Sequence, residues 1–204
     1  MLEQSGLHFY LNWAKERIDE MDAALGSFEI RAGKAKAEAE AEIKADRIVA
    51  DLRKCRDKFQ AELKAQAQAG EATWAHTKMD LERQWNTFET QMNAYFENAG
   101  KQIDQQKATF KNIAGAQARA WHEAADKFRE AAGKVAASHA GEFEAGLEQM
   151  KADASTANAR LATLKQAGGE SWAVLSAALA ESRKAFDQAN QAVWHALKGS
   201  GGKS

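Results

Sequence analysis

The stretch IDQQKATFKNIAGAQARAWHEAADKF, residues 103–128, decides the fold class of this chain. In it, Ile103, Phe110, Trp121 and Phe128 are separated by 7, 11 and 7 residues. At 100° per residue, these spacings place the four side chains within about 40° of one another around a helix. The pattern predicts an amphipathic α-helix with one apolar face.

The same helical phase continues on both sides of this stretch, from Leu63 to Leu197. No proline, the residue that breaks helices, occurs in the 204 residues. Alanine, the strongest helix former, supplies much of the apolar content, so narrow seams between helices are expected rather than a thick core. The chain is therefore predicted to be all-α, with long amphipathic helices forming an extended antiparallel coiled coil or helical bundle.

The N-terminal segment carries an apolar stripe of its own. Leu11, Ile18 and Leu25 are seven residues apart, and their phase differs from that of the later stripe by more than about 100°. A break is therefore expected between Gly26 and about Ala41, at Gly26-Ser27 or at Gly33. Residues 1–33 are predicted to form an N-terminal helix and hinge.

Glycines divide the rest of the chain. Residues 34–167 are predicted to be a long helical region with candidate breaks near Gly70 and Gly100. The run Gly168-Gly169-Glu170-Ser171 predicts a turn, followed by a C-terminal helix over residues 170–198. The glycine-rich tail, residues 199–204, is expected to be disordered.

Charge and composition exclude several classes of protein. The net charge is −1, and no cluster of basic residues indicates contact with nucleic acid. No apolar run approaches the length of a transmembrane helix, and the N-terminus lacks the features of a signal peptide. With a single cysteine, which suits a reducing compartment, a cytoplasmic location is expected.

The sign of the charge alternates along the chain. Residues 1–33 and 71–100 carry a net negative charge, whereas residues 34–69 and 101–134 carry a net positive charge. Such alternation favours segments that lie side by side, either by folding back or by pairing with another chain.

No catalytic or metal-binding motif is apparent. The residues three before the five histidines are not carboxylates, as a di-metal helical bundle would need, and HExxH is missing. Cys55 lies near the edge of the apolar stripe, where a half-buried structural thiol is the simplest interpretation. We therefore expect no enzymatic activity, no cofactor and no catalytic residue.

The aromatic residues exceed what a plain coiled coil needs, because coiled-coil seams prefer Leu, Ile and Val. Bulky rings could fill gaps between alanine-rich helices in a bundle, whereas Trp and Phe opposite a charged face are also typical of helices in a lipid interface. The mean hydropathy of −0.59 is low for a strong lipid binder. The predicted interaction face consists of Trp74, Trp85, Phe88, Ile103, Phe110, Trp121, Phe128, Trp172, Phe186 and Trp194.

Residue spacings also suggest a resemblance to two groups of proteins. Leu164, Leu175, Phe186 and Leu197 are spaced by 11 residues, and a second series, Phe128, Met150, Trp172 and Trp194, by 22. This periodicity resembles that of bacterial coiled-coil proteins described as apolipoprotein-like. The helix-forming segment QAGGESWAVLSAALAESRKAFDQANQAVWHALK is similar in kind to phasins, which coat storage granules. The resemblance implies a lipid or granule surface and no catalytic residue.

Two functions are expected from this pattern. The first is a non-enzymatic structural or interaction protein, acting as a homo-oligomer or with a helical protein partner. The alternative is an amphipathic coat protein that binds peripherally to a lipid or storage-granule surface.

Overall fold

The computed structural model describes residues 4–32, 39–69, 74–98, 103–132, 140–167 and 171–199, and these ranges contain six helices and no strand. The prediction of an all-α fold is confirmed. The helices are α1 (Gln4–Ala32), α2 (Ala39–Ala69), α3 (Trp74–Asn98), α4 (Ile103–Ala132), α5 (Ala140–Ala167) and α6 (Trp172–Gly199).

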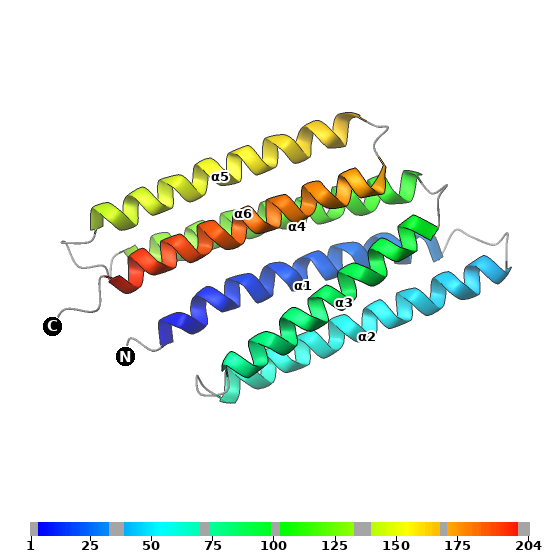
Figure 1. The fold of residues 1–204 in the computed structure, drawn as a ribbon, viewed down its shortest axis with the longest axis horizontal. Helices are drawn as coiled ribbons and strands as arrows, with labels where there is room; N and C mark the ends of the chain where they lie inside the picture. The colour runs from blue at the N-terminus through cyan, green and yellow to red at the C-terminus, as the bar shows by residue number, and fades with distance from the viewer. Residues whose placement is uncertain are drawn as a thin grey trace.

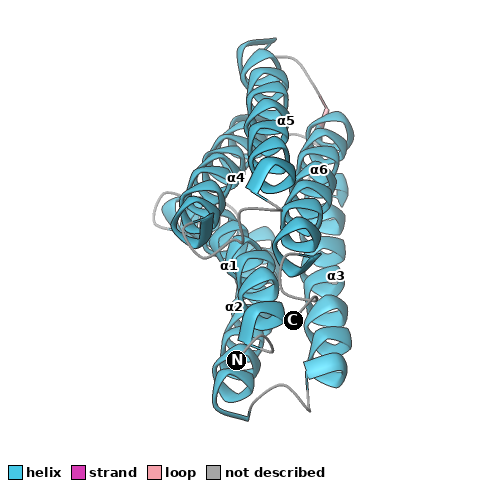
Figure 2. Ribbon diagram, turned by 90° about the vertical axis from the view of Figure 1, so that its left-hand side faces the viewer, coloured by secondary structure: helices cyan, strands magenta, loops and turns pink. Residues whose placement is uncertain are grey.

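The six helices lie roughly along one common axis and form a bundle (Figure 1). α1 is central and contacts α2, α3, α4 and α6, whereas α5 packs on α4 and α6 and α2 packs on α1 and α3. The end-on view in Figure 2 shows α5 at one extreme of the cross-section and α2 and α3 toward the other. The long region therefore folds back on itself repeatedly. Of the two predicted architectures, an extended coiled coil and a helical bundle, the structure is a bundle.

Polar contacts between α1 and α4 establish that these helices are antiparallel. Ser27 and Thr109 share a hydrogen bond of 2.6 Å, Gln117 donates to Glu20 at 2.9 Å, and Lys127 donates to Asn12 at 3.0 Å. Residue numbers rise on one helix as they fall on the other. The negatively charged N-terminal segment thus lies beside the positively charged segment that contains α4, in keeping with the predicted side-by-side packing.

The helix boundaries differ from the predicted ones in two places. α1 continues through Gly26 to Ala32, so Gly26-Ser27 is not a break, and Gly33 lies outside the described residues. The described helices α4 and α5 are separate, ending at Ala132 and beginning at Ala140, although no break was predicted there. A glycine inside a helix costs stability but does not end the helix when packing on neighbours supports it.

Other boundaries agree with the sequence. α2 ends at Ala69 and α3 at Asn98, beside the candidate breaks at Gly70 and Gly100. The carbonyl of Ser171 accepts the backbone N–H groups of Val174 and Leu175, each at 3.1 Å, and so begins the predicted C-terminal helix. That helix extends to Gly199, and residues 200–204 of the predicted tail lie outside the described residues.

The buried apolar side chains form two clusters. The larger joins α1, α2 and α3 to the first part of α4, to α6 and to Leu161 near the end of α5, and the smaller joins the second part of α4 to α5 and α6. The outermost helices attach through narrow seams. On α5 the seam repeats in the heptad pattern of a coiled coil, through Phe143, Leu147, Met150, Ala157 and Leu161.

Replacing Gly26 with alanine tests whether α1 is continuous. A Cβ atom at Gly26 would meet no atom within 4 Å, so the substitution adds helix propensity without a clash. We expect Gly26→Ala to raise the free energy of unfolding by about 0.5–1 kcal/mol, measured by urea denaturation. A decrease would contradict a continuous helix through this position.

Candidate functional site: a charged cluster inside the bundle

The predicted interaction face lies mostly inside the single chain. Ile103, at the first residue of α4, is 54% exposed, and the side chain of Trp74 falls outside the part of the structure that is described. The apolar helix faces therefore meet one another within the bundle. The face members that are at most 8% exposed are Trp85, Phe88, Phe110, Trp121, Phe128, Trp172, Phe186 and Trp194.

Ring contacts explain why these aromatic residues are buried. Trp121 and Phe186 meet edge to face with ring centroids 5.2 Å apart, which joins α4 to α6. Phe96 and Trp172 lie 4.2 Å apart and join α3 to α6, and the indole N–H of Trp172 donates to Asn93 Oδ1 at 2.9 Å. Bulky rings thus fill the space between helices, as one of the two sequence interpretations expected.

A group of buried charged side chains, which the sequence analysis did not identify, lies where α1 meets α3, α4 and α6. Glu16 and Glu20 of α1 are each 1% exposed, and Arg17 and Arg183 are also buried. Charged residues are almost never fully buried unless they are paired, so this arrangement needs a physical account. We call it the charged cluster, and its members are Glu16, Arg17, Glu20, Glu89, Arg183 and Asp187.

Glu20 is the best-satisfied member of the charged cluster. Arg183 donates to both of its carboxylate oxygens, from Nε at 3.1 and 3.2 Å and from Nη2 at 2.8 Å. Gln117 of α4 adds a fourth contact through Nε2 at 2.9 Å. Burial alone would raise the pKa of Glu20, but the Arg183 guanidinium and hydrogen bonds with Glu16 and Arg183 lower it to about 2. Glu20 is therefore ionised at neutral pH.

Glu16 has a poorer set of partners, although it lies one helical turn away. Arg17 Nη1 donates to Oε2 of Glu16, while Oε1 is buried and has no hydrogen-bond donor among the described residues. Burial raises the pKa of Glu16 well above its usual value, and the nearby Arg17 opposes this shift only in part. Two neighbouring carboxyl groups of the same helix are thus held in unequal environments.

The two arginines lie against tryptophan rings as well as carboxylates. The guanidinium carbon of Arg17 is 5.1 Å from the ring centroid of Trp13 and 5.2 Å from that of Trp85. Arg183 lies 4.6 Å from the same Trp85 ring. Cation–π contacts of this kind favour a charged guanidinium in a buried position. They also connect the charged cluster on α1 and α6 to the aromatic face of α3.

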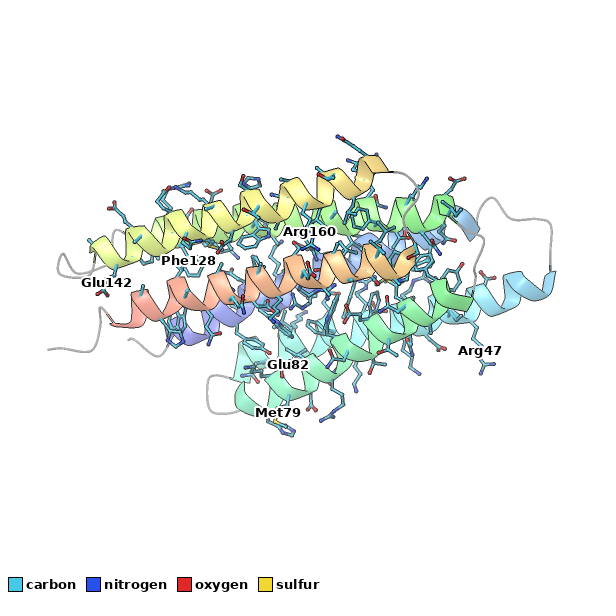
Figure 3. All side chains as sticks on the ribbon, turned by 45° about the horizontal axis from the view of Figure 1, so that its top comes forward. Arg47, Met79, Glu82, Phe128, Glu142 and Arg160 are labelled. Atoms are coloured by element: carbon cyan, nitrogen blue, oxygen red, sulfur yellow. The ribbon has the colours of Figure 1, made fainter. Side chains whose placement is uncertain are left out.

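The hollows beside these residues are small or open. A cavity of about 10 Å³ lies between α1 and α4 next to Glu16, which is room for about one water molecule. A groove of about 570 Å³ runs along the outer side of α3, and its described lining residues, Met79 among them, all belong to that helix. Figure 3 shows Met79 and Arg47 projecting outward from α3 and α2.

Cys55 and His76, two of the residues that the sequence analysis considered for catalysis, lie on different helices. Cys55 is half-buried between α2 and α3, where its thiol donates to the carbonyl of Gln84 at 3.2 Å, and burial raises its pKa. His76 is exposed and lies 3.5 Å from Asp80 of its own helix. Within the described ranges, no three His, Cys, Asp or Glu side chains are grouped so that they could hold a metal ion.

No protein-family model, curated protein or solved structure matches this chain. In the described part of the chain, no helix has an apolar stretch long enough to cross a bilayer. The charged cluster can do two things chemically. It can fix the register of α1 against α4 and α6 through directional hydrogen bonds, and it can bind or release a proton at its carboxyl groups.

The spacing of apolar residues in the sequence did not reveal the charged cluster, for a specific reason. On an isolated amphipathic helix, charged residues such as Glu16 and Glu20 are assigned to the solvent-facing side. From residue 10 to residue 28, however, Asp22 is the only exposed residue of α1, because other helices surround this helix. The partners of Glu20 come from far along the chain, so no local signal identifies them.

Removing the charge of Glu20 should be costly. Glu20→Gln leaves Arg183 buried without its main counter-charge, and breaking a buried pair in this way costs about 3–5 kcal/mol. Glu181→Gln is the matched control, because Glu181 pairs with Arg160 at the surface, where an ion pair is worth about 1 kcal/mol or less. Denaturant unfolding at neutral pH measures both. Equal effects of the two substitutions would contradict the structural role of the charged cluster.

Proposed function

We propose that this chain is a non-enzymatic structural or interaction protein, which acts by self-association or by binding a helical partner through its long amphipathic helices. The observation that carries the proposal is the weak attachment of α2. Among the described side chains of α2, residues 46–66, only Leu52, Phe59 and Gln66 are buried. They are seven residues apart, which is the spacing of a coiled-coil seam.

The energetics of this seam favour exchange of the helix. Burying one large apolar side chain contributes about 1.5–3 kcal/mol, so the two fully buried ones, Leu52 and Phe59, contribute a few kcal/mol, to which the partly buried Ile48, Val49, Cys55 and Leu63 add. An element with few fully buried side chains opens more readily than the rest of a protein. The ion pair from Arg56 of α2 to Asp22 of α1, at 3.3 Å, is partly exposed and adds little.

The surface beneath α2 suits another amphipathic helix. Phe59 lies 6.0 Å, between ring centroids, from Trp13 of α1, and both belong to the same apolar cluster as Leu81 and Phe88 of α3. When α2 moves away, this surface of aromatic and aliphatic side chains is exposed. A groove of this kind accepts a helix that presents apolar residues at heptad spacing.

A specific observation also supports the alternative, a coat on a lipid or granule surface. Aromatic side chains line the inner faces of helices on both sides of the bundle, and opening the bundle would turn these faces outward. In the described part of the closed bundle, the exposed large apolar side chains lie on three different helices; they are Met79, Ile103 and Val174. This function therefore requires the helices to separate.

A peptide copy of α2 tests the proposed interaction. A labelled peptide of residues 39–69 carrying Cys55→Ser should bind the protein by taking the place of α2. Cys55, the only cysteine of the protein, then no longer lies against Gln84. A thiol reagent should therefore modify Cys55 faster when the peptide is present.

The matched control is the same peptide with Phe59→Ala, which removes the ring that packs against Trp13 and should bind far more weakly. Sedimentation of the protein over a range of concentrations reports self-association. No binding of either peptide, together with a single monomeric species at every concentration, would contradict the proposal.

The coat alternative has its own measurement. Because Trp172 and Trp194 are already buried, their emission wavelength is a poor indicator of lipid contact. Quenching of tryptophan emission by brominated lipid in anionic vesicles reports direct contact instead, and the coat function predicts such quenching together with flotation of the protein with the vesicles. Protein that stays out of the vesicle fraction would argue against a lipid coat.

A further inference from the structure

The charged cluster contains more acidic than basic groups. Arg17 is shared by Glu16 and by Asp187, whose Oδ2 lies 2.6 Å from Nη2. Arg183 is shared by Glu20 and by Glu89, whose Oε1 lies 2.6 Å from Nη1. Four carboxyl groups thus face two guanidinium groups. Glu89 and Asp187 are 26% and 35% exposed, so water screens part of this excess negative charge, whereas Glu16 and Glu20 are buried, where an ionised carboxylate is costly unless it is fully hydrogen-bonded.

The hydrogen bonds indicate which carboxyl group relieves this excess. Glu20 accepts four contacts from Arg183 and Gln117, whereas Glu16 and Asp187 each have one oxygen without a donor among the described residues. Glu16 is the more deeply buried of these two, 1% exposed against 35% for the Asp187 side chain. Two ionised carboxylates cannot hydrogen-bond to each other, since both are acceptors only. A proton on Glu16 supplies the missing donor, and Glu20, one helical turn away, supplies the acceptor.

We propose that Glu16 and Glu20 form a proton-binding site inside the bundle, in which Glu16 carries the proton and donates it in a hydrogen bond to Glu20, and that release of this proton loosens α1 from α4 and α6. The site does not depend on which partner the helices bind. Its ligand is a single proton, and the balance is simple: Glu16 changes from a carboxylic acid to a carboxylate, and the proton passes to solvent.

The geometry of the α1–α4 interface provides a route for the proton. The cavity of about 10 Å³ beside Glu16 is bordered by small residues of α4, Ala120 and Ala124, and by polar side chains. One water molecule there could accept the proton. The charged groups that face Glu16 or line this cavity are Arg17, Lys15, Asp19 and Glu20 on α1, Glu123 and Lys127 on α4, and Arg183 and Asp187 on α6, with Glu89 of α3 acting through Arg183.

The sign of the pH effect follows from the pKa shifts. Because burial raises the pKa of Glu16 in the folded protein, the stabilisation linked to its proton is lost as pH rises from about 4.5 through that raised pKa. The pKa of Asp187 is also raised by burial, so Asp187 acts in the same direction. Glu20 acts in the opposite direction, and its contribution is lost as pH falls from about 4.5 through 2.

Glu16→Gln tests the site, because the glutamine amide is a permanent donor that mimics the protonated acid. Between about pH 4.5 and the raised pKa of Glu16, the unfolding constant of the unmodified protein should rise by about tenfold per pH unit relative to that of Glu16→Gln. Glu144→Gln, the same change at an exposed position of α5, should keep the pH slope of the unmodified protein. Denaturant unfolding at a series of pH values gives these constants.

Infrared spectroscopy of the unmodified protein adds a direct measurement that needs no variant. At a pH where exposed carboxyl groups are ionised and Glu16 still holds its proton, the folded protein should show the carbonyl band of a protonated carboxyl group, and this band should disappear at higher pH and be missing in Glu16→Gln. Two results would overturn the site: a folded protein without this band, or a pH slope that survives Glu16→Gln. A slope that Asp187→Asn removes and Glu16→Gln leaves intact would place the proton on Asp187 and overturn it equally.

Discussion

The burial of α1 is the constraint on which the rest of the structure depends. This helix is covered by four others along most of its length, yet it carries Glu16, Arg17 and Glu20 into the interior. A buried charge without a partner costs several kcal/mol, so α6 must bring Arg183 and α4 must bring Gln117 to the same level of the bundle. The pairing of these side chains therefore restricts the register of three helices at once. Apolar packing alone restricts the register less specifically, because it is not directional.

The apolar packing is distributed unevenly around this central helix. One cluster joins α1 to α2 and α3 as well as to α4 and α6, and a second cluster lies among α4, α5 and α6. The outer helices use heptad-spaced seams, and α2 has the fewest buried side chains along its described length. The bundle therefore combines a centre with many buried side chains and an edge with few. An interaction protein that works by exchanging helices needs that combination, because a partner must displace one helix without unfolding the others.

Sequence reasoning succeeded where the structure obeys the period of a single helix. The phase that links Phe110, Trp121 and Phe128 correctly placed all three on the buried side of α4. Ile103 has the same phase but is exposed, because it is the first residue of α4. The phase shows which side of the helix a residue is on, but it does not show whether another helix covers that side. Of the two candidate breaks, Gly26-Ser27 and Gly33, the first lies inside α1, where tertiary packing overrides the low helix propensity of glycine, and α1 ends at Ala32, beside the second.

The amino-acid sequence by itself determined that the chain is helical and that each helix has an apolar side, because both properties depend on residues within a few turns of one another and on the lack of proline. Only the tertiary structure decided which faces meet and which charges are buried. Glu20 and Arg183 are 163 positions apart, and Ser27 and Thr109 are 82 apart. Contacts over such separations arise when the chain folds back on itself, so no local pattern of residues could have specified them.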